Sequence, residues 1–188
     1  MPTVRTPTAI RAEPDESSEQ VTEALPGEPL EVEETRGGWA RVRTAYDYPG
    51  WLRAEALGGE PDPDWLEARA ADPVEHARGF LGTRYVWGGM TAAGIDCSGL
   101  VHMSFRATGR LVPRDADQQE DAGAPVDEGS ARPGDLVTYG GEQAADHVAF
   151  WLGDGRILHS TQREGADGVV EEDEPDELRA RRRMFFRL

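Results

Sequence analysis

The stretch DCSGL (96–100) places Cys97, the only cysteine of the chain, where a glycine-rich loop gives way to an apolar segment with helical spacing. A lone cysteine cannot form an internal disulfide bond. At the N-terminus of a helix, unpaired backbone N–H groups and the positive end of the helix dipole stabilise a thiolate. The position therefore indicates a reactive thiol, with a small buried apolar side chain as the alternative.

Two histidines follow in strand-like segments, His147 in DHVAFWLGDG and His159 in GRILHST. The sequence GDG (153–155) between them predicts a hairpin that brings both rings to the same side of adjacent strands. One cysteine with separated histidines is the pattern of a nucleophile and its base. We predict Cys97 as the nucleophile, His147 as the base and His159 as the residue that orients the base. A zinc site built from these three side chains is the alternative, although the usual zinc-ligand spacings are absent.

The N-terminal part of the chain reads as all-β. Residues 1–58 contain five short segments in which apolar and polar residues alternate, separated by Gly, Pro and acidic residues. This pattern predicts a small barrel. The sequence GEPDPDW (59–65) combines Gly, Pro and Asp and predicts a linker to a second domain over 66–188.

The second domain has the sequence pattern of a domain that contains both helices and strands. Pro73 is expected to open one helix, and a second helix is expected from about Cys97 to Thr108. Strands are predicted near LVTYG, HVAFWLG, RILHS and the closing RRRMFFRL, whereas 111–135 and the acidic run EEDEPDE (171–177) are expected to be loops. The fold class is therefore α+β, a small barrel followed by a mixed domain.

The net charge of the chain limits the classes of macromolecule that it can bind. The chain has 36 acidic and 20 basic residues and a formal net charge of −16, which argues against nucleic acid and anionic membranes as partners. No stretch approaches the roughly 18 apolar residues of a membrane span. The N-terminal residues lack a basic region followed by an apolar run, so a cytoplasmic location is expected, and a reduced thiol suits it. A chain trimmed of a secretion signal would look identical.

Five motifs now point to one family. YVWGG (85–89), DCSGL (96–100), PRDADQQ (113–119), RPGDLV (132–137) and DHVAFWLGDGRILHS (146–160) resemble the NlpC family of papain-like bacterial cell-wall peptidases, also called the p-sixty family. The match runs from residue 73 to about 163 in the expected order. The resemblance implies a papain-like α+β core, cleavage of peptidoglycan stem peptides next to γ-D-glutamate, and no metal or cofactor. By motif it implies the same roles for Cys97, His147 and His159.

The same resemblance suggests further site residues. Tyr85 precedes Cys97 by twelve residues, and its hydroxyl is a candidate to stabilise the oxyanion together with the Cys97 N–H. The alternative is that Tyr85 is a core aromatic residue. Ser98 is expected to supply hydrogen bonds to the loop and to line the substrate site.

The predicted barrel also resembles a known type of domain. GGWARVRTAYDYPGWLRAEAL (37–57) is similar to a bacterial SH3-like domain. NlpC-type peptidases with such an N-terminal domain can use it to cap the cleft, cut the γ-D-glutamyl–diamino acid bond and require a free N-terminal L-alanine. A free ammonium calls for carboxylates and an aromatic hydroxyl. Asp96 matches the acidic position that serves this role. The candidates from the barrel are Glu13, Tyr46, Asp47 and Tyr48, of which Glu13 and Tyr48 are preferred.

The function expected from these observations is a cysteine endopeptidase acting on L-Ala-γ-D-Glu-diamino acid peptides during wall recycling. Three alternatives remain. One is a secreted hydrolase of intact peptidoglycan, and another is a non-catalytic wall-binding module. The third is an acyltransferase, for which the chain offers no amphipathic membrane segment.

Overall fold

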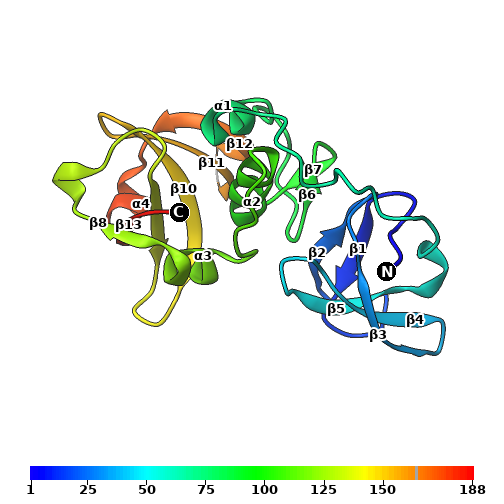
Figure 1. The fold of residues 1–188 in the computed structure, drawn as a ribbon. Coiled ribbons are helices and arrows are strands. Elements are labelled where there is room, and N and C mark those ends of the chain that lie inside the picture. The colour runs from blue at the N-terminus through cyan, green and yellow to red at the C-terminus, as the bar shows by residue number, and fades with distance from the viewer. Residues whose placement is uncertain (164) are drawn as a thin grey trace.

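The structure, a computed structural model, describes residues 1–163 and 165–188 and consists of two lobes (Figure 1). The N-terminal lobe is a five-stranded antiparallel sheet in the order β2-β1-β5-β4-β3. Its elements are β1 Thr8–Arg11, β2 Gln20–Ala24, β3 Glu31–Arg36, β4 Trp39–Arg43, β5 Pro49–Arg53 and the 3-10 turn η1 Ala54–Ala56. Ile10, Leu30, Val42 and Leu52 are fully buried in its core. The predicted short strands are therefore confirmed.

The second lobe is built on a six-stranded antiparallel sheet in the order β12-β11-β10-β9-β13-β8. Its strands are β8 Ala124–Val126, β9 Leu136–Gly140, β10 Ala145–Gly153, β11 Arg156–Arg163, β12 Ala166–Asp173 and β13 Arg182–Arg187. The other elements are α1 Pro73–Arg78, α2 Cys97–Ala107, α3 Ala116–Ala122, α4 Asp176–Arg179, the small hairpin β6 Met90–Thr91 with β7 Gly94–Ile95, and the 3-10 turn η2 Glu128–Ser130. The α+β class is confirmed.

Helix α2 lies between the two lobes in Figure 1 and carries the cysteine. Its apolar residues Leu100, Val101 and Phe105 are buried in the core that includes Phe150 and Leu158 of the sheet. Helix α1 begins at Pro73 because the Asp72 carboxylate accepts hydrogen bonds from the next two free N–H groups. Within the described residues, no helix is long and apolar enough to cross a membrane.

Two segments that were expected to be loops are ordered elements instead. The region 111–135 contains α3, β8 and η2, and α3 is held by Gln119, whose side-chain amide donates to the Ser98 and Pro113 carbonyls at 3.0 and 2.9 Å. The acidic run 171–177 continues β12 to Asp173 and then enters α4. Arginines neutralise its carboxylates, since Arg156 pairs with Glu171 at 3.2 Å. Charge alone therefore predicted the wrong structure there.

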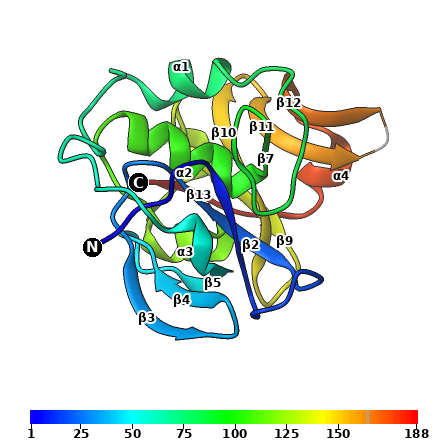
Figure 2. The ribbon, with the colours of Figure 1, turned by 90° about the vertical axis from the view of Figure 1, so that its right-hand side faces the viewer.

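The two lobes are in direct contact, and Figure 2 views them from the side of the barrel. Arg106 of α2 forms an ion pair with the fully buried Glu28 of the barrel at 2.9 Å. Gly88 approaches the barrel so closely that an added Cβ would lie 2.7 Å from the Gln20 carbonyl oxygen, and its φ of +71° also favours glycine. The barrel therefore packs against the segments that flank Cys97.

Candidate active site

Cys97 is the first residue of α2 and lines a pocket of about 440 Å³. Asp96 is the N-cap, because its carboxylate accepts a hydrogen bond from the Gly99 N–H at 2.6 Å. The Val148 N–H of β10 hydrogen-bonds to the thiol. Since Val148 directly follows His147, this contact brings the histidine strand against the cysteine.

The predicted pair of histidines is joined to a carboxylate that the sequence analysis missed. His147 Nε2 lies 2.7 Å from His159 Nδ1, and His159 Nε2 lies 2.9 Å from Glu172 Oε1. Arg163 donates to the other oxygen of Glu172 at 2.5 Å. Neighbouring strands β10, β11 and β12 thus carry one continuous row of polar groups.

This row determines the tautomers of both rings. The Glu172 carboxylate only accepts hydrogen bonds, so His159 Nε2 must carry a proton. His159 Nδ1 of the neutral ring then accepts from His147 Nε2, which leaves the lone pair of His147 on Nδ1. The hydrogen bonds from His159 and then Arg163, acting against partial burial, lower the pKa of Glu172 to about 2. The carboxylate is therefore ionised at neutral pH.

Burial keeps the nucleophile and the base neutral at rest. Burial, followed by the Asp96 charge, raises the pKa of Cys97 to about 12. Burial, followed by His159 and Arg181, lowers the pKa of His147 to about 3. Both shifts favour an uncharged thiol and an uncharged imidazole in the free protein. The thiol proton then passes to His147 as the thiol attacks a substrate.

Replacing Glu172 with glutamine is expected to lower kcat for a cleavable peptide by at least about tenfold. The charge that stabilises an imidazolium on His147 is lost, and the amide N–H₂ can also select the wrong His159 tautomer, a change that costs about 10⁴ when it occurs directly beside a catalytic histidine. Steady-state kinetics across pH 5–9 measure the effect. Glu171→Gln is the matched control, because Glu171 pairs with Arg78 and Arg156 instead. Equal losses in both variants would contradict the role of Glu172.

Asp96 and Ser98 are held by a buried arginine. The guanidinium of Arg114 donates to both oxygens of Asp96, at 3.0 and 2.7 Å, and to Ser98 Oγ at 2.8 Å. The Gly88 N–H donates to Asp96 as well, at 2.7 Å. Although burial lowers the pKa of Arg114, the Asp96 charge and hydrogen bonds raise it overall. The charge of Asp96 is thus already compensated within the protein, and its main contacts position α2 and the glycine loop.

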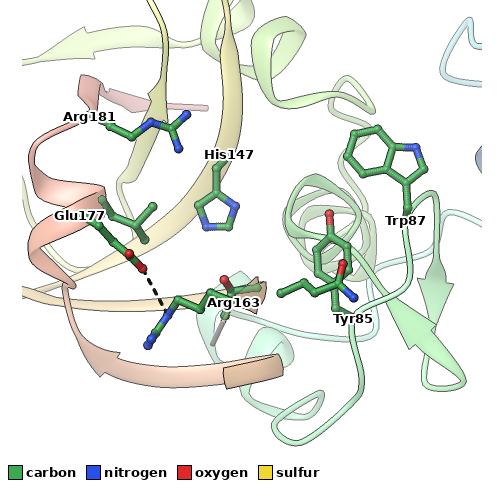
Figure 3. Close-up of a pocket in the computed structure, with 9 residues that line it drawn as sticks. Tyr85, Trp87, His147, Arg163, Glu177 and Arg181 are labelled. Atoms are coloured by element: carbon green, nitrogen blue, oxygen red, sulfur yellow. Dashed lines mark ion pairs between the residues drawn. The ribbon is translucent and has the colours of Figure 1, made fainter. Parts of the chain in front are cut away.

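Tyr85 and Trp87 lie on the loop before Cys97 and line a second pocket, of about 700 Å³, together with His147. Figure 3 shows the two aromatic side chains on one side of this pocket, with Arg181, Glu177 and Arg163 towards the other side. Burial and then the nearby Cys97 raise the pKa of Tyr85. Its hydroxyl therefore keeps its proton and can donate to an oxyanion formed beside the cysteine.

The barrel contributes to the Cys97 pocket, but with a different carboxylate from the expected one. Tyr48 lines the pocket, and its hydroxyl donates to Asp115 at 2.8 Å. Glu19 lines it too, whereas Glu13 lies on a separate surface of the barrel with Arg36 and Arg41. Glu19 directly precedes β2 and lies on the side of the barrel that faces the second lobe. The structure therefore does not bring Glu13 to the pocket that Cys97 lines.

Sequence reasoning did not single out several side chains that line or support the site, because their residue types are common in this chain. They are Glu19, Arg114, Asp115, Glu172, Arg163 and Arg181. The one available signal for Glu172 was the alternation of side-chain direction in a strand over 166–173. Such a strand places Glu171 and Glu172 on opposite faces. In the described part of the chain, no group of three or more His, Cys, Asp or Glu residues is arranged to hold a metal ion.

Comparison with known proteins identifies both lobes. The profile of the NlpC/P60 family matches residues 82–177, just over half of the chain. The profile described as the bacterial dipeptidyl-peptidase SH3 domain matches residues 10–57.

Named relatives agree with these profiles. The chain is 34% identical over 104 residues to a γ-D-glutamyl-L-lysine dipeptidyl-peptidase of Bacillus cereus, covering 54% of this chain and 31% of the relative. It is 39% identical over 94 residues to the protein of the same name from Bacillus subtilis, covering 48% and 32%. The chain thus spans about a third of the length of these relatives.

A solved structure resembles both lobes together. The crystal structure of an NlpC/P60 family protein from Bacillus cereus matches with a TM-score of 0.60 and 27% identity, over 99% of this chain and 62% of that protein. The family profile covers the cysteine, both histidines and Glu172, and the structural match extends across the barrel. This chain belongs to the NlpC/P60 family.

Proposed function

We propose that the protein is a cysteine peptidase that cleaves the γ-D-glutamyl–diamino acid bond of free peptidoglycan stem peptides beginning with L-alanine. The observation that carries the proposal is that barrel residues Glu19 and Tyr48 line the same pocket as Cys97. A barrel in this position narrows the cleft and leaves room for a short peptide with a free end. The proposal extends to a cytoplasmic role in the recycling of wall fragments.

The geometry supplies each step of such a reaction. Cys97 Sγ attacks the γ-glutamyl carbonyl carbon while the thiol proton passes to His147 Nδ1. Tyr85 and the Cys97 N–H donate to the oxyanion. The protonated His147 then gives its proton to the departing amine, which leaves a thioester. His147 next takes a proton from water as the water oxygen attacks the thioester carbonyl carbon. The C–S bond then breaks, the glutamyl carboxylic acid leaves, and His147 returns the proton to Cys97 Sγ.

The Cys97 pocket has the charge needed to hold the N-terminal ammonium of the peptide. Among the residues that the structure describes, its charged lining consists of the carboxylates of Glu19, Asp96, Asp115, Asp117 and Asp146. Burial raises the pKa of Asp115, so a bound ammonium would favour the ionised form. Tyr48 orients Asp115 through its hydroxyl. We assign recognition of the ammonium to Tyr48, Asp115 and Glu19, with Asp96 behind them.

The test is mass spectrometry of the protein incubated with L-Ala-γ-D-Glu-meso-diaminopimelate and with its N-acetylated copy. Cleavage of the free peptide alone is expected, because acetylation removes the positive charge. Glu19→Gln is expected to raise KM for the free peptide about fivefold, the upper range for an exposed ion pair. Glu13→Gln is the matched control and should leave KM unchanged.

Other outcomes would point elsewhere. Equal cleavage of both peptides would keep the peptidase and reject recognition of the ammonium. Cleavage of purified sacculi with no action on either peptide would favour a hydrolase of intact peptidoglycan. No cleavage of any of these substrates would favour a binding role.

A further inference from the structure

Two pockets, one lined by Cys97 and the other by His147, share Trp87 and differ in charge. The pocket on the barrel side is lined only by acidic residues among its charged groups. The pocket on the other side, of about 700 Å³, is lined by Arg163 and Arg181 together with Glu177. Both arginines lie at the pocket that holds the ring of His147, and Figure 3 shows them around that ring.

The order of the substrate along the cleft follows from this difference and rests on the proposed function. The ammonium end of the peptide belongs in the acidic pocket beside Tyr48. The scissile bond lies at Cys97, so the leaving diamino acid must lie beyond it. His147, which protonates the leaving amine, lines the pocket with the two arginines. That pocket is therefore the site of the diamino acid.

The charges of the pocket distinguish between the two diamino acids of stem peptides. In a tripeptide, meso-diaminopimelate presents two carboxylates and one side-chain ammonium, whereas lysine presents one carboxylate and one ammonium. The lining side chains supply two guanidinium groups and one carboxylate. Guanidinium binds carboxylates through paired N–H donors, and Glu177 can accept the ammonium.

Arg181 retains N–H donors for a ligand, and Arg163 lines the same pocket. Arg181 contacts Asp146 through one terminal nitrogen at 2.5 Å, and a guanidinium has five N–H donors. Arg163 is anchored by Glu172 at 2.5 Å and lies 4.0 Å from Glu177. Trp87 is 58% exposed at the edge shared by the two pockets, where it can cover the peptide.

We infer that Arg163, Arg181 and Glu177 form a selectivity pocket for diaminopimelate. The protein then prefers peptides ending in meso-diaminopimelate over the same peptides ending in L-lysine. The extra carboxylate adds a charge-assisted hydrogen bond, which corresponds to about a tenfold difference in kcat/KM.

The experiment compares kcat/KM for L-Ala-γ-D-Glu-meso-diaminopimelate, its side-chain carboxamide and L-Ala-γ-D-Glu-L-Lys. The wild-type protein should favour the first about tenfold over each of the others. Arg181→Gln should reduce this ratio towards one. Arg179→Gln is the matched control, because Arg179 pairs with Glu174 outside the pocket, and should preserve the ratio. Calorimetric titration of the Cys97→Ala protein with each peptide measures the same preference without turnover.

These readouts separate the inference from the proposed function. Equal kcat/KM for the three peptides, or an unchanged ratio in Arg181→Gln, would overturn the selectivity pocket while the peptidase stands. Selective binding to Cys97→Ala without turnover by the wild type would support the pocket and reject the peptidase. Neither binding nor cleavage would overturn both.

Discussion

Cys97→Ala is expected to abolish cleavage of L-Ala-γ-D-Glu-diamino acid peptides, with a loss in kcat of about 10⁶, the size seen when a protease loses its nucleophile. The reason is that the chain has no second cysteine, and that the row of His147, His159 and Glu172 begins on the strand whose Val148 N–H contacts this thiol. Single-turnover mass spectrometry should show no thioester. Thermal unfolding should change little, because one buried sulfur atom is removed, and retained turnover would reject the mechanism.

The same cysteine can be tested by alkylation, since it is the only thiol in the chain. With its pKa raised to about 12 by burial and Asp96, the thiolate fraction increases about tenfold for each pH unit between 7 and 10. The rate of modification by iodoacetamide should rise in proportion in the free protein. A rate that is already maximal at pH 7 would indicate a preformed thiolate and contradict the neutral resting pair.

Arg114→Met is expected to have the largest effect on stability, about 3–5 kcal/mol, because it leaves the carboxylate of Asp96 buried without its partner. Arg114 also donates to Thr22 Oγ1 of the barrel at 3.1 Å, so the contact between the lobes weakens too. Urea denaturation measures the change. Arg110→Met is the control, since Arg110 is exposed and contacts only the Phe105 ring among the described interactions.

A second substitution tests the cause of this destabilisation. Asp96→Asn in the Arg114→Met background removes the uncompensated charge and should recover part of the lost stability. If the double variant is as unstable as the sum of the two single variants, the ion pair is not the source of the effect.

Local patterns predicted a large share of the fold because they depend on residues close in the chain. The alternation in 1–58 predicted strands, the apolar spacing after Cys97 predicted a helix, and GDG (153–155) predicted the hairpin of β10 and β11. The prediction of a loop over the acidic run 171–177 was wrong, because the strand there is stabilised by Arg78 and Arg156, which are distant in sequence. When the arginines that neutralise it are not known, an acidic run has the sequence pattern of a loop.

For the site, the sequence by itself identified a unique thiol at a helix start and two histidines that a tight turn brings together. It also identified Tyr48 as a barrel residue of interest. The choice of Glu19 over Glu13 required the docking of the barrel, and the role of Glu172 required the pairing of β11 with β12. The raised pKa of Cys97 required the burial of the thiol in the folded chain. These features depend on charges and burial contributed by residues far apart in the chain, and only the tertiary structure brings those residues within a few ångströms of each other.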